Sequence, residues 1–228
     1  MVILYSVPHD FPATELVENG IRDVFNHNTS FSVQLFSEYL DLSRFRDTEQ
    51  RQALAALLNE RYKGGGLDLV ILVDTPAIFF LLEHEVLLAG IPAVMCLVPE
   101  VIQERIANSR LGGRACGVLI TQNFINEYVR ASLALFPHAK QVAFASGAFE
   151  ADLVHATMLR QALELAKGSR QIMDLSGLNL EELEHKSSRL SRNTPIFFST
   201  LFVDQTGRSY IPRRVLEGLV SSTSAPIF

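Results

Sequence analysis

The sequence has no tryptophan, only two cysteines and no cluster of basic residues. The cysteines, Cys96 and Cys116, allow at most one internal disulfide, and their apolar neighbours favour free buried thiols. Lysine and arginine number 20 against 25 aspartates and glutamates, which gives a net charge of −5. A nucleic-acid-binding surface needs a local excess of positive charge, so we expect no nucleic-acid partner.

No apolar stretch is long enough to cross a membrane. The longest one, residues 86–99, is interrupted by Gly90 and Pro92, whereas a membrane span takes about 20 residues. A strand-like run over residues 2–5 follows Met1 directly, which does not fit a signal peptide. Residues 225–228 look like the start of a buried strand. We therefore expect a domain of a longer protein, joined to a membrane only through segments outside this chain.

Short apolar runs typical of strands alternate with amphipathic helical stretches along the chain. This alternation predicts an α/β fold with parallel sheets flanked by helices. Residues 108–114 are the one candidate linker near the middle, so we expect two Rossmann-like lobes, residues 1–108 and 109–228. The predicted strands are 2–6, 31–39, 69–73, 93–98, 117–121, 141–145, 171–175, 196–203 and 225 onward. The predicted helices are 14–26, 48–62, 76–88, 124–135, 150–167, 179–190 and 212–220.

The candidate binding residues follow from a general rule for such folds. In open α/β sheets, ligands bind outside the carboxyl ends of the strands. Asp74 is expected either to bind a ligand's hydroxyl or ammonium group or to cap the next helix. His9 contacts ligand or holds its own loop, and Phe11 is a wall of the site or part of the core. The full set of predicted ligand contacts is Ser6, His9, Phe11, Asp74, Thr75, Leu97, Ser146, Gly147, Thr200 and Asp204.

Catalytic and metal-binding motifs are incomplete in this sequence. Residues 112–117 have the outer spacing of a phosphate-binding loop, but Val118 stands where lysine is required. Leu88 occupies the second histidine position of a zinc-protease pattern that His84 would begin. Ser146 lacks the glycines that flank a nucleophilic serine, and Cys116 is placed poorly to face Cys96 as in a two-cysteine racemase. We expect no catalytic residue, no metal and no cofactor.

Several of these strand ends also match a known family. The chain resembles the ABC-transporter substrate-binding-like domains of bacterial sensor kinases and related signalling proteins. The resemblance covers nearly the whole chain and is most specific in the first half. It rests on residues 3–6 with His9 and residues 11–12, on 38–41, 44–45 and 68–74, on 80–84 and 90–94 with Cys96, and on 201–202 with Asp204, Gly207, Tyr210 and Pro212.

The resemblance implies a type I periplasmic-binding-protein fold whose two lobes close on a small ligand. It implies an extracytoplasmic sensor domain of a membrane-anchored histidine kinase or cyclase, in the periplasm or outside the cell. The alternatives are a free-standing transporter substrate-binding protein, a two-lobed enzyme, and a cytoplasmic effector domain of a transcription regulator. An exposed helix of the first lobe could form a homodimer. Thr75 replaces a frequent second acid of the family and Leu97 a frequent glycine, so the expected cleft is less polar and the ligand is left open.

Overall fold

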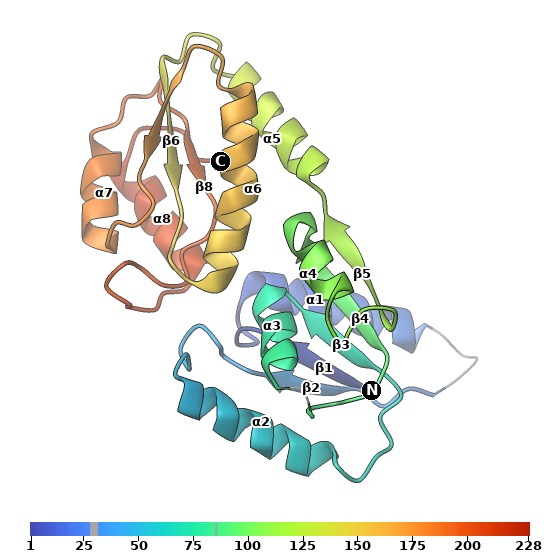
Figure 1. The fold of residues 1–228 in the computed structure, drawn as a ribbon. Coiled ribbons are helices and arrows are strands. Elements are labelled where there is room, and N and C mark those ends of the chain that lie inside the picture. Colours follow the sequence, from blue (N-terminus) through green and yellow to red (C-terminus); the bar gives the residue numbers. More distant parts are fainter. Residues whose placement is uncertain (28–31, 85) are drawn as a thin grey trace. The chain divides into compact units, whose positions relative to one another are not determined.

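The computed structural model describes residues 1–27, 32–84 and 86–228, and they form two compact units, Met1–Leu119 and Ile120–Phe228 (Figure 1). Each unit has its own sheet with helices on both faces. Among the described residues, none of the helices is both long and apolar enough to cross a membrane.

The first unit is built on a five-stranded sheet in the order β2-β1-β3-β4-β5. The pairs β1–β2, β1–β3 and β3–β4 are parallel. Residues of β1 and β3 are all buried, as expected for central strands covered on both faces. The strands are β1 (Val2–Tyr5), β2 (Phe36–Tyr39), β3 (Val70–Val73), β4 (Ala93–Pro99) and β5 (Ala115–Ile120).

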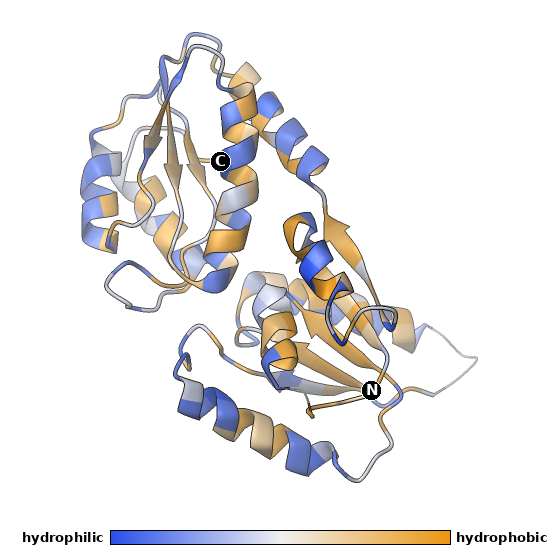
Figure 2. Cartoon of the chain, viewed as in Figure 1, coloured by the Kyte–Doolittle hydropathy of each residue, from blue (hydrophilic) through white to orange (hydrophobic). Residues whose placement is uncertain are grey.

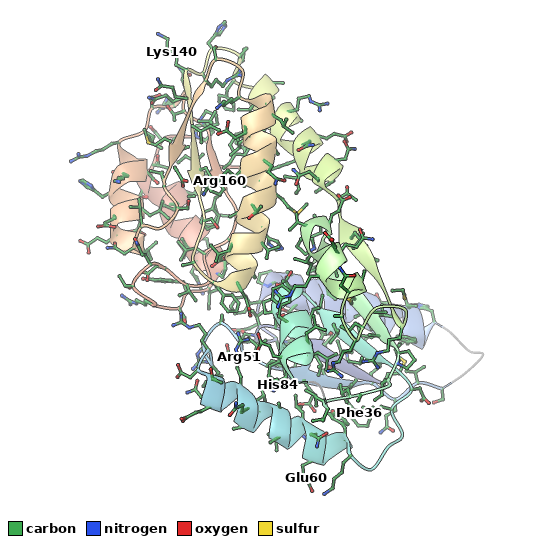
Figure 3. All side chains as sticks on the ribbon, in the orientation of Figure 1. Phe36, Arg51, Glu60, His84, Lys140 and Arg160 are labelled. Atoms are coloured by element: carbon green, nitrogen blue, oxygen red, sulfur yellow. The ribbon has the colours of Figure 1, made fainter. Side chains whose placement is uncertain are left out.

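Helices cover both faces of this sheet. One face packs Ile3 and Tyr5 of β1 against Val17 and Ile21 of the first helix. Side chains alternate along a strand, so Leu4 points to the other face, where α2 and α3 lie (Figure 1). Arg51 of α2, which is labelled in Figure 3, forms an ion pair at 3.0 Å with Glu83 of α3. The helices are α1 (Pro12–Asn26), α2 (Thr48–Tyr62), α3 (Thr75–Glu83), a 3₁₀ turn (Glu100–Ile102) and α4 (Gln103–Ala107).

The second unit has a parallel three-stranded sheet in the order β7-β6-β8. Val142 and Phe144 of β6 pack toward α5 and α6, whereas Ala143 and Ala145 pack toward α7 and α8. Figure 2 shows hydrophobic residues gathered in the strands of each unit and hydrophilic residues along the outside of the helices. The elements are α5 (Gln122–Ala134), β6 (Gln141–Ala145), α6 (Glu150–Ala166), β7 (Gln171–Asp174), α7 (Leu180–Ser188), β8 (Ile196–Phe198) and α8 (Pro212–Ser222).

The predicted fold class is therefore confirmed: parallel sheets are flanked by helices throughout. The expected last strand is limited to a bridge between Ile227 and Ile196. The strand predicted over 196–203 ends at Phe198, and the helix predicted over 76–88 ends at Glu83. Of the strand predicted over 31–39, the structure has Phe36–Tyr39, and residue 31 lies outside the described residues.

The segment taken as a linker, residues 108–114, is part of the first unit. Arg110 donates hydrogen bonds from its guanidinium to the carbonyl oxygens of Leu81, His84 and Leu87. The strand after it, β5, which was expected to open the second lobe, instead forms the edge of the first sheet. The division between units therefore falls after Leu119 rather than after residue 108.

The two cysteines are free thiols, but the expectation that both are buried is wrong for one of them. Cys96 is half-buried in β4, whereas Cys116 is exposed on the edge strand β5. Cys116 is therefore the more accessible of the two thiols.

Candidate functional site

The carboxyl ends of β2, β1, β3 and β4 lie side by side at one end of the first sheet, which we call the first rim. The register places Tyr5 beside Tyr39 and Val73, and Val73 beside Cys96. The residues that follow these positions are therefore neighbours. They include four of the predicted contacts, Ser6, Asp74, Thr75 and Leu97.

Ser6 has a structural role at this rim. Its side chain is buried, donates to the carbonyl oxygen of Val73 at 2.8 Å and accepts from the backbone N–H of Ala77 at 2.9 Å. The hydroxyl thus ties the end of β1 to the end of β3 and to the first turn of α3. Both of these bonds lie within the protein, which makes Ser6 a support of the rim.

Asp74 caps helix α3, which is one of its two predicted roles. Its carboxylate accepts from the backbone N–H of Thr75 at 2.7 Å, and its own N–H donates to the carbonyl oxygen of Cys96 at 3.0 Å. The backbone of Asp74 has φ 73° and ψ 160°, a conformation that residues other than glycine rarely adopt.

Backbone strain is concentrated at this rim. Among the described residues, four other than glycine have positive φ: Asp41, Asp74, Leu88 and Leu97. Asp41 and Asp74 lie just beyond the carboxyl ends of β2 and β3, and Leu97 lies two residues before the end of β4. Such strain costs of order 1–3 kcal/mol per residue and tends to cluster at ligand sites. The φ of 57° at Leu97 gives a physical reason why glycine suits this position.

Three polar atoms at the first rim are buried and have no hydrogen-bond partner in the protein. Within residues 1–27, 32–84 and 86–228, which the structure describes, these unpartnered atoms are the hydroxyl oxygen of Tyr5, Oδ1 of Asp41 and the hydroxyl oxygen of Thr75. Burying a polar group without a partner costs roughly 1–3 kcal/mol, so each such group calls for an explanation. These residues end or follow three adjacent strands, β2, β1 and β3.

A carboxylate on α1 organises the neighbouring side chains. Glu18 is buried and accepts hydrogen bonds from Arg22 at 2.6 Å, from Ser37 at 3.0 Å and from the Tyr39 hydroxyl. Burial alone raises the pKa of Glu18, but these hydrogen bonds from Tyr39, Arg22 and Ser37 outweigh it and hold that pKa below its usual value. Burial, followed by the bond to Glu18, raises the pKa of Tyr39 to about 12.

His9 and Phe11 differ in their exposure to solvent. The His9 side chain is 61% exposed, with its ring edge on Tyr39 and Nε2 3.7 Å from a Glu18 oxygen. It remains a candidate contact at the rim. Phe11 is buried in the core beside the start of α1, which fits its predicted role as wall or core.

In the second unit, three predicted contacts surround Asp152, a buried aspartate on α6. Gly147 donates its N–H to the carbonyl oxygen of Thr200 at 2.7 Å, and Ser146 donates its hydroxyl to the carbonyl oxygen of Asp152 at 3.2 Å. The Asp152 carboxylate accepts from the Thr200 hydroxyl at 2.5 Å and from the N–H groups of Phe149, Phe202 and Val203.

Burial raises the pKa of the Asp152 carboxyl despite these bonds. The space beside it is full, because a Cβ added at Gly147 would lie 2.3 Å from an Asp152 oxygen. The side-chain hydroxyls of Ser146 and Thr200 are therefore used in holding the loops together.

Asp204 belongs to a separate turn. Its carboxylate accepts from the N–H and hydroxyl of Thr206, from the N–H of Arg208 and from the Tyr210 hydroxyl at 2.9 Å. Burial alone would raise the pKa of Asp204. These hydrogen bonds outweigh burial and hold that pKa below its usual value. None of these four bonds involves Ser146 or Thr200, although Val203, the residue before Asp204, donates its N–H to Asp152.

Four residues that matter here were not among the predicted contacts: Tyr5, Glu18, Asp41 and Asp152. Asp41 lies two residues after the strand that ends at Tyr39, so the rule of strand ends could have selected it. Glu18 lies on the apolar face of α1 beside Val17 and Ile21, where an acid is unexpected. Asp152 is three residues after the helix cap at Phe149, the position of a capping-box acid.

Comparison with known proteins finds solved structures of similar fold. No family model and no curated protein matches the chain. Solved structures do match along nearly all of it. An ABC domain from Streptococcus pneumoniae in complex with L-Trp has a TM-score of 0.65 and 18% identity, covering 97% of this chain and 69% of that one.

Two other structures are solute-binding proteins of ABC transporters. One from Rhodopseudomonas palustris, in complex with 3,4-dihydroxybenzoic acid, has a TM-score of 0.57 and 12% identity, covering 100% of this chain and 61% of that one. One from R. palustris, in complex with benzoate, has a TM-score of 0.61 and 10% identity, covering 99% of this chain and 61% of that one. The chain thus spans less than two thirds of both of these proteins and has an α/β fold like theirs.

Proposed function

We propose that this chain is a binding module for a small organic molecule and that the first rim supplies the main contacts. The observation that carries the proposal is the set of unpartnered buried polar atoms on Tyr5, Asp41 and Thr75. A ligand that hydrogen-bonds these atoms would remove the free-energy cost of leaving them unpaired. The strained backbone of Asp41, Asp74 and Leu97 at the same strand ends supports the same location.

The chemistry of these atoms favours an α-amino acid. The Thr75 hydroxyl stands in the first turn of α3, where the helix dipole and a free donor suit a carboxylate. Oδ1 of Asp41 is an acceptor and suits an ammonium group. Tyr5 and Tyr39 stack with ring centroids 5.0 Å apart and give the rim an aromatic side. The matching Streptococcus pneumoniae structure, which is in complex with L-Trp, supports this class.

Because the three atoms are closed to solvent, binding requires a local rearrangement of the rim. A thermal-shift screen of amino acids, aromatic acids, sugars and purines tests the proposal. A ligand at one hundred times its Kd adds about 2.7 kcal/mol of stability. We expect an amino acid to raise the melting temperature and Asp41→Asn to reduce that rise. If only sugars or purines stabilise the chain, the proposed ligand class is wrong.

We infer further that the module works outside the cytoplasm as the binding part of a transporter-type solute-binding protein. The names of the matching structures support this role. A membrane-anchored sensor domain of a histidine kinase or cyclase, which the resemblance implies, is the second candidate. The full-length gene separates the two, because a kinase or cyclase region after residue 228 would support the sensor. In both roles the chain binds a ligand without catalysing a reaction. Analytical sedimentation would test whether the chain forms a homodimer.

A further inference from the structure

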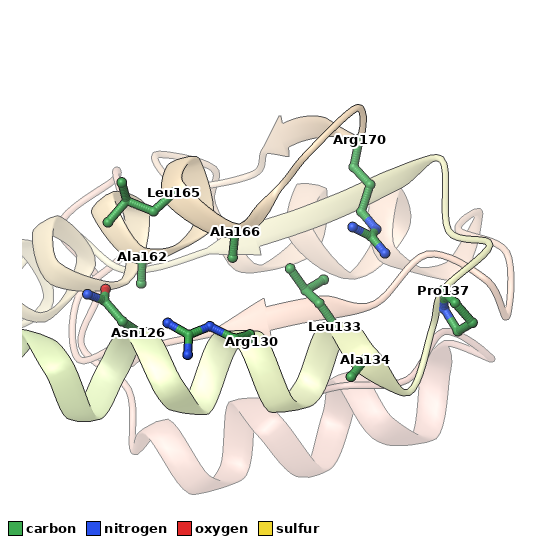
Figure 4. Close-up of a pocket in the computed structure, with 9 residues that line it drawn as sticks. All are labelled: Asn126, Arg130, Leu133, Ala134, Pro137, Ala162, Leu165, Ala166 and Arg170. Atoms are coloured by element: carbon green, nitrogen blue, oxygen red, sulfur yellow. The ribbon is translucent and has the colours of Figure 1, made fainter.

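We propose that the second unit carries a separate site for an amphipathic organic anion, such as a medium-chain carboxylate. The site is a groove of about 390 Å³ between the carboxyl-terminal halves of α5 and α6, which we call the α5–α6 groove (Figure 4). Its volume lies in the range of small-molecule sites, about 300–1,000 Å³. It is lined by Asn126, Arg130, Leu133, Ala134, Pro137, Ala162, Leu165, Ala166 and Arg170.

The lining combines an apolar floor with two cations. Leu133 and Ala162 belong to the core of the unit, and Leu165 is 76% exposed at the side of the groove. Arg130 and Arg170 contribute positive charge, and none of the lining residues is acidic. An anion with an apolar body would match both features, because guanidinium groups bind carboxylates with paired hydrogen bonds.

Neither arginine is neutralised within the described part of the chain. Arg170 donates to the carbonyl oxygens of Lys167 and Phe136, both at 3.3 Å, and its buried Nε has no partner. Arg130 is exposed, and no hydrogen bond or ion pair of its side chain occurs among the described residues. The nearby acid Glu164 is already paired with Lys167 at 2.5 Å.

The α5–α6 groove is distinct from the strand-end region of its own unit. Helix α6 begins after the carboxyl end of β6, near Asp152, and its last turn, which lines the groove, is at the opposite end of the helix. Figure 4 shows Arg170 extending from the turn after α6 toward Leu133, while Arg130 reaches between the two helices from α5. The residues that line the α5–α6 groove all belong to the second unit, whereas those of the first rim belong to the first.

An NMR titration of the isotope-labelled full chain with sodium octanoate tests the site. We expect saturable shifts at the backbone amides of Leu133, Ala166 and Arg170, with the amide of Thr75 unchanged. Arg130→Gln and Arg170→Gln should each weaken binding about tenfold or more, as expected for a bond to a charged group. Arg192→Gln, at an exposed arginine outside the groove, is the matched control and should bind normally.

Two further titrants define the ligand class. Octanol, which has no charge, should bind much more weakly than octanoate, and inorganic phosphate, which has no apolar body, should do the same. Equal binding of phosphate would overturn the apolar part of the proposal, and equal binding of octanol would overturn the role of the arginines. Shifts confined to the first rim would overturn the site itself while leaving the proposed function intact.

Discussion

Thr75→Val removes the hydroxyl of Thr75, which is one of the three unpartnered polar groups of the first rim. Valine has nearly the shape of threonine, with a methyl group in place of the hydroxyl. The Thr75 hydroxyl oxygen is buried and makes no hydrogen bond in the free chain. Its burial costs roughly 1–3 kcal/mol, so its removal should stabilise the free chain by about 1 kcal/mol. For a chain of this size, that corresponds to a rise in melting temperature of about 2–4 °C.

Ser6→Ala is the control, because the Ser6 hydroxyl makes two internal hydrogen bonds at 2.8 and 2.9 Å. Losing both should destabilise the chain by about 2 kcal/mol. Circular dichroism melts of the two variants should therefore move in opposite directions from wild type. A drop in melting temperature for Thr75→Val similar to that of Ser6→Ala would show that its hydroxyl is bonded within the free protein, and the reasoning would be refuted.

Substitutions at three other residues test the interactions that support the two units. Asp152→Ala leaves three backbone N–H groups and the Thr200 hydroxyl without their acceptor, and should cost about 3 kcal/mol or more in urea unfolding; a loss under about 1 kcal/mol would contradict this. Asp74→Ala should cost about 1–2 kcal/mol by the same measurement, whereas Asp74→Asn, which keeps a capping oxygen, should cost less; equal losses would argue against the cap. Glu18 has a lowered folded-state pKa, so its stabilisation is present above its ordinary value of 4.5 and lost as pH falls through the folded value. Glu18→Gln should therefore be less stable at neutral pH but lose less stability on acidification, and parallel pH profiles would rule this out.

The fold class could be predicted from the sequence because the strand runs are short, apolar and separated by amphipathic helices. The position of β5 could not, since Gly112 and Gly113 look like a linker while the contacts of Arg110 that hold this segment are with residues far back in the chain. The early end of β8 has a similar cause. Asp152 binds the N–H groups of Phe202 and Val203 fifty residues away, and this draws the backbone out of the strand.

For the candidate site, the sequence could group residues at the strand ends but could not predict the hydrogen bonds that each of them makes. The rule of strand ends selected Ser6, Asp74 and Thr75, which do share one rim. It could not separate Ser6, whose hydroxyl is satisfied inside the protein, from Thr75, whose hydroxyl is not. That difference depends on which backbone groups lie within about 3 Å, and sequence patterns carry no such distances.

The most direct test of the binding claim is a calorimetric titration with the amino acid that stabilises the chain best. Wild type is compared with the double variant Tyr5→Phe/Thr75→Val, in which two of the unpartnered hydroxyls are absent. Loss of two ligand hydrogen bonds should raise the Kd about tenfold or more, while the melting temperature of the free protein stays at or above that of wild type. An unchanged Kd, or no detectable heat with any compound of the screen, would contradict a ligand site at the first rim.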